Sequence, residues 1–350
     1  MSRESPSFPI PIVCAPMGAG PSTPALAAAV SEAGGLGFLA AGYKSADDVR
    51  AEIAAVREAT ARPFGVNLFV PSAPFEDRAA LAAYVARLEP EARRHGVAVG
   101  DPVWTDDGWE AKLEVVLAER PPVVSFTFGC PEPEVVQLLQ SRGITVWCTV
   151  TAPAEARNAA EAGVDALVVQ GSEAGAHQGS WLREGDPLPL LTLIQLVRAE
   201  TDLPLVATGG LATGAAMAAV LVAGAWAAQL GTAFLLCPEA GTSAVHRAAL
   251  RAGGETRLTR AFTGRWARGI ANRFMDDHPD APPAYPEIHY ATAPLRAAAR
   301  EAGDAGGINL WAGTTFELTR DLPAAQLVAA LASETSAALG TGFKRLLPAA

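Results

Sequence analysis

The sequence predicts an α/β protein built on a (β/α)8 barrel, with a mainly helical cap inserted after the eighth strand. Three observations lead to this prediction. Eight short apolar, β-branched runs alternate with helical patterns, and eight parallel strands joined by helical crossovers are the number that closes a barrel. Ala-Gly pairs repeatedly precede a strand. The 350 residues also leave about 100 beyond the roughly 250 that such a barrel uses.

The predicted strands are nearly continuous apolar runs, as expected for strands that are covered on both faces. They are expected at 11–15, 36–40, 64–69, 123–128, 145–150, 166–170, 205–208 and 227–234. No charged residue occurs between 203 and 238, yet Pro204 and several glycines interrupt this stretch. It therefore predicts two buried strands around an alanine-rich helix rather than a membrane span.

Helices are predicted between the strands, where apolar residues recur at helical spacing. They are expected at 23–33, 46–59, 132–141, 154–162, 188–200 and 214–223, and a last helix at 324–338 returns to cover the barrel. Three of them stop at Gly34, Gly163 and Gly224, since glycine favours helix C-termini.

Two segments contain the residues that the barrel does not need. A helical, charged insertion covers 71–120, and residues 237–322 form the predicted cap, or substrate, domain. The barrel domain then comprises 1–236 and 323–350. Both segments leave the carboxyl ends of strands, where barrel enzymes build their active sites.

Composition limits the classes of partner. The chain has 27 Lys and Arg against 37 Asp and Glu, a net charge of −10, which argues against nucleic acid or an anionic membrane as partner. Its four cysteines form no CxxC pair, so free thiols in a reducing cytosol are expected rather than disulfides or a metal site. The N-terminus lacks the apolar core of a signal peptide, so we expect a cytoplasmic protein.

Glycines follow the seventh and eighth predicted strands, within Ala207-Thr208-Gly209-Gly210 and Gln229-Leu230-Gly231-Thr232. Without a Cβ, the backbone N–H groups of such loops can approach an anion closely. The helix expected to begin near 212–214 adds its positive N-terminus. The two loops therefore predict a phosphate site, although tight turns alone would also account for the glycines.

A glycine-rich loop at 171–179 leaves the sixth predicted strand and contains His177. None of the other four histidines lies in such a loop. Imidazole titrates near pH 6.5 and can take or hold a proton at neutral pH, so His177 is predicted to be catalytic or to bind substrate. Glu173 could orient His177, or it could be a solvated loop acid.

Polar residues also occur inside apolar strands. Asn67 and Gln170 are such residues, and because buried amides must be hydrogen-bonded, each either caps neighbouring backbone or faces a polar ligand ring. The first strand leads into Met17, Gly18 and Gly20, but Thr23 stands at the third glycine position of a dinucleotide fingerprint, which disfavours a Rossmann site.

Taken in order, these motifs resemble the nitronate monooxygenase family, formerly called 2-nitropropane dioxygenase. The resemblance covers almost the whole chain. The segments at 262–265, 268–274 and 310–313 are similar to those of the family's class I branch.

This resemblance implies one FMN bound non-covalently at the mouth of the barrel. Met17 and Gly18 would line the flavin, and Asn67 and Gln170 would hydrogen-bond its ring system. His177 matches the active-site histidine of the family. The residues expected around the ring and the phosphate are Gly175, Gly209, Gly210, Gln229, Leu230, Gly231 and Thr232.

The family resemblance also implies an activity. The enzyme would oxidise alkyl nitronates such as propionate 3-nitronate with O2, through a one-electron step, releasing nitrite and a carbonyl product. The expected partners are a small-molecule nitronate and O2, and assembly as a homodimer stays open. Two alternatives are an FMN barrel that uses NAD(P)H to reduce an enoyl thioester or a quinone, and a non-catalytic barrel that binds a phosphate ligand.

Two positions depart from the family pattern. Ala176 stands where glycine is common, which constrains the loop if a positive φ is needed there. Gln178 stands where a basic residue is frequent, which removes a cation that could hold an anionic substrate. Arg265, Arg268 and Arg273 could supply positive charge from the cap, or they could bridge the cap to the barrel.

Overall fold

The computed structural model describes residues 8–182 and 187–346. Eight parallel strands follow one another in the order β1-β9-β8-β6-β5-β4-β3-β2. Between the two ends of this series, a parallel bridge joins Val13 of β1 to Leu36, beside β2, and the Leu36 N–H donates to the Ile12 carbonyl at 2.9 Å. This contact closes the sheet, so the predicted barrel is confirmed. The strands are β1 (Ile12–Cys14), β2 (Gly37–Ala40), β3 (Phe64–Phe69), β4 (Val123–Thr127), β5 (Thr145–Val150), β6 (Ala166–Gln170), β8 (Leu205–Thr208) and β9 (Ala227–Leu230).

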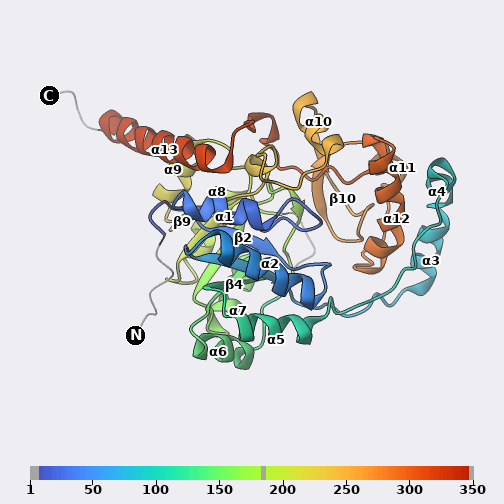
Figure 1. The fold of residues 1–350 in the computed structure, drawn as a ribbon, viewed down its shortest axis with the longest axis horizontal. Helices are drawn as coiled ribbons and strands as arrows, with labels where there is room; N and C mark the ends of the chain where they lie inside the picture. The colour runs from blue at the N-terminus through green and yellow to red at the C-terminus, as the bar shows by residue number, and fades with distance from the viewer. Residues whose placement is uncertain (1–7, 183–186, 347–350) are drawn as a thin grey trace.

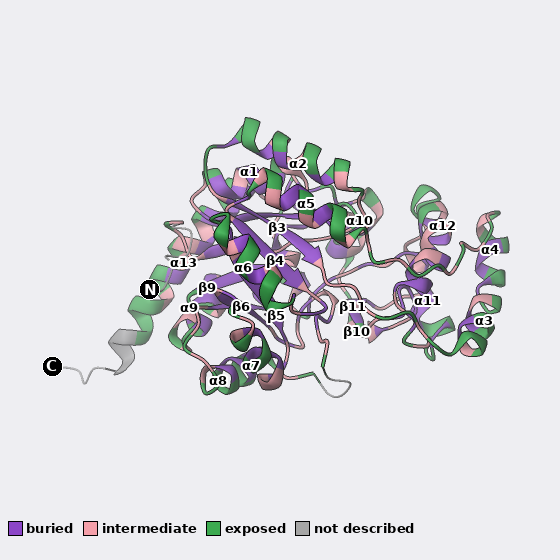
Figure 2. Ribbon diagram, turned by 90° about the horizontal axis from the view of Figure 1, so that it is seen from below, coloured by how far each residue is buried: buried purple, intermediate pink, exposed green. Residues whose placement is uncertain are grey.

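Helices follow most of the strands and cover the outside of the barrel (Figure 1). Their inner faces are buried and their outer faces are exposed (Figure 2). None of the described helices has both the length and the apolar character that crossing a membrane requires. The covering helices are α1 (Pro24–Glu32), α2 (Ala46–Ala59), α5 (Trp109–Glu119), α6 (Pro133–Ser141), α7 (Pro153–Glu161), α8 (Leu190–Arg198), α9 (Gly214–Val222) and α13 (Ala324–Leu346).

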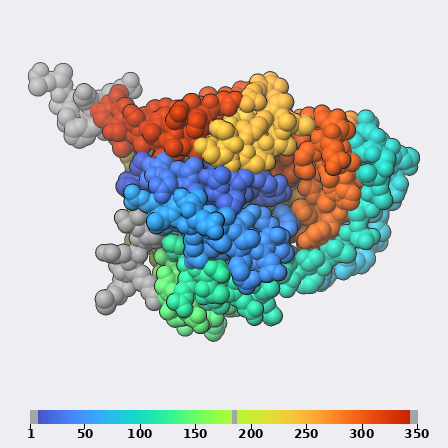
Figure 3. Space-filling model, viewed as in Figure 1, coloured from blue at the N-terminus to red at the C-terminus, as the bar shows by residue number. Residues whose placement is uncertain are grey.

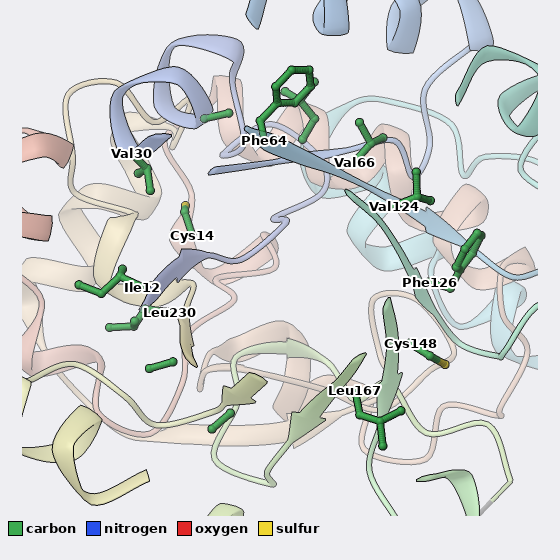
Figure 4. Close-up of a cluster of buried hydrophobic side chains, with 14 of the residues drawn as sticks. Ile12, Cys14, Val30, Phe64, Val66, Val124, Phe126, Cys148, Leu167 and Leu230 are labelled. Atoms are coloured by element: carbon green, nitrogen blue, oxygen red, sulfur yellow. The ribbon is translucent and has the colours of Figure 1, made fainter. Parts of the chain in front are cut away.

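Side chains alternate between the two faces of each barrel strand. One set fills the interior, where Phe38 and Trp147 pack with ring centroids 5.5 Å apart. The other set, including Cys148, Leu167 and Leu230, forms an apolar layer beneath the helices (Figure 4). At the carboxyl ends of the strands the inward positions become polar, and this change marks where a ligand can bind.

Most predicted strand and helix boundaries agree with the structure to within two residues, and three differences have a clear description. The eighth strand ends at Leu230 rather than at residue 234, because the chain turns into a 3-10 helix, η1 (Thr232–Phe234). The fourth strand ends at Thr127, since Phe128 has a φ of 73°. The last helix is longer than predicted and runs to Leu346.

A second unit lies beside the barrel mouth. It is not wholly helical, because β10 (Thr256–Thr259) and β11 (Ala267–Ile270) form an antiparallel sheet with β7 (Ala176–His177) from the loop after β6. The remaining elements of this unit are α10 (Ala244–Ala252), α11 (Arg273–Asp277), α12 (Glu287–Glu301), η2 (Ala305–Gly307) and η3 (Phe316–Leu318).

The predicted insertion at 71–120 divides between the two units. Its first helices, α3 (Arg78–Ala86) and α4 (Glu89–His95), lie against α11 and α12 and share an apolar core with them (Figures 1 and 3). Its last helix, α5, packs against α2 on the barrel.

Candidate active site

A cavity of about 330 Å³ lies at the carboxyl ends of the barrel strands, within the size range of small-molecule sites. Loops that follow the strands form one wall, and residues of α12 and of the segment before η3 form the other. Eleven of the twelve residues predicted for the site line this cavity: Met17, Gly18, Asn67, Gln170, Gly175, His177, Gly209, Gly210, Gln229, Gly231 and Thr232.

The twelfth residue, Leu230, points away from the cavity. Its neighbour Gln229 faces inward, and side chains alternate along a strand, so Leu230 faces the helices. Leu230 is 1% exposed and lies in the apolar layer of Figure 4. Its side chain therefore takes no part in binding a ligand in this cavity.

The side-chain amides that face the cavity differ in how many of their hydrogen-bonding atoms have a partner in the protein. Asn67 Nδ2 lies 2.9 Å from both Ser125 Oγ and Thr127 Oγ1, while no described residue donates to its Oδ1. The amide of Gln229 has no hydrogen bond to any residue that the structure describes, although this side chain is only 7% exposed. Since buried polar groups are almost always paired, these amides indicate a polar ligand.

Gln170 has a different role from the other two amides. Its Oε1 accepts the N–H of Gly179 at 2.7 Å, and its Nε2 donates to the His177 carbonyl at 3.2 Å. Gln170 thus caps backbone while it lines the cavity, and it holds in place the loop that bears His177.

The glycine loops after β8 and β9 form a cradle. Gly209 and Gly210 have φ values of 119° and 65°, and a Cβ at Gly210 would meet the Glu173 Cβ at 2.9 Å. The backbone N–H groups of Gly231 and Thr232 have no acceptor among the described residues. Loops of this kind can bind a phosphate through their N–H groups.

The N-terminus of α9 is not part of this cradle, contrary to the sequence expectation. The N–H of Gly214 donates to Glu334 of α13 at 3.1 Å, and Arg320 holds the same carboxylate at 2.6 and 2.8 Å. The chain thus provides its own anion for this helix end.

His177 lies on β7, where it pairs with Ala267 of β11. Its Nε2 is 2.9 Å from Thr263 Oγ1, which orients the ring. Burial, followed by the charges of Arg265 and Arg296, lowers the pKa of His177 from 6.5 to about 3. The imidazole is therefore neutral at neutral pH.

Glu173 does not contact His177. Both carboxylate oxygens accept the N–H of Leu190, at 3.1 and 3.0 Å, so Glu173 caps the first turn of α8. Neither expected role, as a partner of His177 or as a solvated loop acid, describes Glu173, because its carboxylate is bound to the helix end.

Two of the three candidate arginines bridge the cap to the loop after β6. Arg265 donates to the Ser180 carbonyl at 2.6 Å, and Arg268 donates to that of Ser172 at 3.0 Å. Arg273 instead binds Glu91 of α4 with two contacts of 2.6 Å. None of the three lines the cavity.

Among the cavity-lining residues that were not predicted for the site are Tyr43, His289, Arg296 and Trp311. Tyr43 and His289 stack with ring centroids 3.8 Å apart, and Arg296 donates to the His289 carbonyl at 2.8 Å. Trp311 lies against His177, with ring centroids 5.8 Å apart. The spacing of His289 and Arg296, seven residues apart on one helical face, was the available signal. This spacing predicts a helix, but it does not predict which face of the helix lies against the barrel mouth.

Backbone strain concentrates at this cavity. Six non-glycine residues of the described chain have positive φ, and four of them line the wall: Ala19, Tyr43, Phe128 and Ala176. A positive φ is especially unfavourable for a bulky residue such as Phe128. Strain of this kind clusters at functional sites, which supports this cavity as the active site.

Comparison with known proteins identifies the family. The chain matches the family described as "Nitronate monooxygenase" over residues 6–334. It belongs to the nitronate monooxygenase family. The nitronate monooxygenase of Paraburkholderia phytofirmans is 41% identical, with 93% of this chain and 92% of that protein covered. The nitronate monooxygenase of Pseudomonas aeruginosa is 42% identical, with 93% and 95% covered.

Solved structures agree with this assignment to the nitronate monooxygenase family. Nitroalkane oxidase from Streptomyces ansochromogenes matches with a TM-score of 0.93 at 50% identity, covering 95% of this chain and 98% of that one. FabK from Thermotoga maritima matches with a TM-score of 0.75 at 26% identity, covering 97% and 96%. The nitronate monooxygenase family consists of flavin-dependent oxidoreductases, so this chain is a flavin enzyme that acts on a small molecule.

Proposed function

We propose that this protein is an FMN-dependent nitronate monooxygenase that oxidises alkyl nitronates with O2 and releases nitrite and a carbonyl product. The observation that supports this function best is the composition of the cavity wall. It combines unpartnered hydrogen-bonding groups for a cofactor with a neutral histidine, His177, and a buried cation, Arg296. Membership of the nitronate monooxygenase family narrows the chemistry to nitronates.

The residues of the wall fit FMN. Asn67 Oδ1 and the Gln229 amide would bind polar edges of the flavin, while Met17 and Gly18 would line it. FMN supplies the electron transfer from the nitronate to O2 when it is bound. The residues that would hold the phosphate end are Gly175, Gly209, Gly210, Gly231 and Thr232.

The low pKa of His177 bears on which form of substrate reacts. A base with a pKa of about 3 is a weak acceptor for a carbon-bound proton at neutral pH, where general bases work best with a pKa near the working pH. A nitronate has already lost that proton. We therefore expect preformed nitronates to react faster than neutral nitroalkanes, with His177 positioning the substrate as a neutral hydrogen-bonding group.

The test is nitrite release under air from a panel of nitronates. His177→Ala should lower kcat/KM at least about tenfold, or about 1.4 kcal/mol, while the purified protein stays yellow. A yellow variant with unchanged nitronate turnover would remove His177 from the mechanism.

Anaerobic reduction separates this function from that of a reductase. A nitronate alone should reduce the flavin and change its absorbance spectrum, whereas NADH or NADPH should not bleach it. The reverse result would favour an enoyl-thioester or quinone reductase. The FabK structures, at 26% identity, give that alternative less support than the nitroalkane oxidase structure at 50%. Assembly as a homodimer stays a prediction that light scattering of the purified protein can check.

A further inference from the structure

Arg296 is a buried cation in the wall of the active-site cavity. It comes from the middle of α12, its residue is 5% exposed, and it lies near His177, whose pKa its charge helps to lower. Buried arginines are normally paired with an acid, because an isolated charge in the interior is costly. The partners of Arg296 therefore indicate whether the protein itself balances this charge.

No carboxylate contacts Arg296 in the described part of the chain. Its Nε donates to Thr292 Oγ1 at 3.1 Å, and its Nη2 donates to the His289 carbonyl at 2.8 Å and lies 3.3 Å from His289 Nδ1. Its Nη1 reaches only Asn309 Oδ1, at 3.5 Å. These partners are all neutral, whereas Arg273 and Arg320 are each held by a glutamate.

The donor count leaves room for a ligand. A guanidinium has five N–H groups, and the four contacts of Arg296 leave one N–H of Nη1 without an acceptor. Nitrogen Nη1 also makes the longest of the four contacts. The cation thus retains both an unbalanced charge and a donor at the cavity.

His289 is set as a second donor by the same arginine. Because an Arg296 N–H points at Nδ1, the neutral imidazole carries its proton on Nε2. Burial, followed by the charge of Arg296, holds the pKa of His289 well below its usual value, so the ring is neutral. The stacked ring of Tyr43, 3.8 Å away, fixes its plane beside the cavity.

We propose that Arg296 and the Nε2–H of His289 form an oxyanion subsite that binds the two oxygens of the nitronate group and selects the anion over the neutral nitroalkane. This inference rests on the proposed function for the identity of its substrate. A nitronate is planar and carries its negative charge on two oxygens, which suits one cationic and one neutral donor. The subsite replaces the cation that Gln178 does not supply.

Arg300 extends this positive surface outward. It lies one turn after Arg296 on α12, is exposed, and also lines the cavity. A charge at the mouth attracts anions to the site but is screened by salt, whereas a buried charge is screened much less. The discrimination between anion and neutral molecule therefore belongs to Arg296.

The experiment compares Arg296→Met with the wild-type holoenzyme. The probe is nitrate, a planar oxyanion, titrated at constant ionic strength by calorimetry and as a competitive inhibitor of nitronate oxidation. The variant should bind nitrate at least tenfold more weakly and raise KM for the nitronate at least tenfold, with a smaller change in kcat. Arg257→Met, which removes an exposed arginine paired with Asp276, is the control and should change neither value.

Flavin absorbance and the melting temperature establish that each variant is folded and loaded. If Arg296→Met does not fold, Arg296→Gln takes its place, since it keeps an amide donor without the charge, and the same loss of nitrate binding is expected. A loaded variant with nitrate affinity and KM within twofold of wild type would overturn the inference.

The outcomes also separate the inference from the proposed function. A wild-type protein that binds nitrate through Arg296 but releases no nitrite from any nitronate would overturn the function and support the anion subsite. Nitronate oxidation that is unchanged in Arg296→Met would support the function and overturn the subsite.

Discussion

Ala176 shows how one residue beside the active site can be strained. Its φ is 61°, and it directly precedes His177 on β7. The left-handed region costs a residue with a Cβ about 1–2 kcal/mol relative to glycine. The sequence departure from glycine at this position therefore has a structural consequence, since the backbone keeps the conformation that glycine would favour.

We expect Ala176→Gly to raise the free energy of unfolding by up to about 1 kcal/mol, because relief of the strained φ exceeds the added entropy of the unfolded chain. Chemical denaturation of the holoenzyme measures this change. Ala174→Gly is the matched control in the same loop, where φ is not positive, and it should destabilise. If both substitutions shifted stability in the same direction, Ala176 would not be strained.

Leu230 illustrates how strand alternation divides a motif between the two faces of a barrel strand. The motif 229–232 resembles the family as a block, so all four residues entered the predicted site together. Successive side chains of a strand point to opposite faces. Gln229 therefore faces the cavity, and Leu230 faces the helices that cover the outside of the barrel. By contrast, no sequence pattern predicts that Gln170 holds the loop that bears His177. The two hydrogen bonds form only because this loop folds back over the end of β6.

At the scale of elements, the N-terminus of α9 combines two segments that are far apart in the sequence. Glu334 lies 120 residues from Gly214, whose N–H it accepts, and it docks α13 onto α9. Sequence analysis predicted both helices but assigned this helix end to a phosphate, because a contact over such a separation leaves no local pattern. In the proposed FMN site, the glycine loops alone would then hold the phosphate.

Glu334→Gln should therefore lower the free energy of unfolding by about 1 kcal/mol, a value set by the helix-end charge and by a half-exposed ion pair. FMN affinity, measured by fluorescence titration, should be unchanged. The control is Asp47→Asn, in the first turn of α2, where the carboxylate is exposed. It should lower the free energy of unfolding by less than Glu334→Gln does. A marked loss of FMN affinity in Glu334→Gln would mean that the N-terminus of α9 does contribute to phosphate binding.

At the scale of the whole molecule, the barrel was predictable and the composition of the second unit was not. Barrel strands and helices follow one another along the chain, so their alternation and stop signals are local. The second unit joins residues 78–95 to residues 261–296, and its core includes Tyr84, whose hydroxyl donates to the Ala261 carbonyl at 2.6 Å. A helical insertion could be recognised from sequence, but its partner could not.

The ion pair of Glu91 and Arg273 tests whether these segments form one cooperative unit. Glu91 is 4% exposed, and both its oxygens accept from Arg273, 182 residues away, at 2.6 Å. Glu91→Gln should lower the free energy of unfolding of this unit by about 2 kcal/mol, since hydrogen bonds to charged groups contribute about 1.5–3 kcal/mol. We expect hydrogen exchange to rise together in 78–95 and 261–296 and to stay unchanged in α1 and α2, because locally unfolding units open cooperatively.

The control for this exchange experiment is Asp276→Asn, which breaks an exposed pair with Arg257 on the same unit. It should leave exchange near the wild-type level, because exposed ion pairs contribute little. A rise confined to 78–95 in Glu91→Gln would mean that the insertion is an appendage. The cap would then be residues 237–322 alone, and Arg296 would keep its position over the cavity without support from α3 and α4.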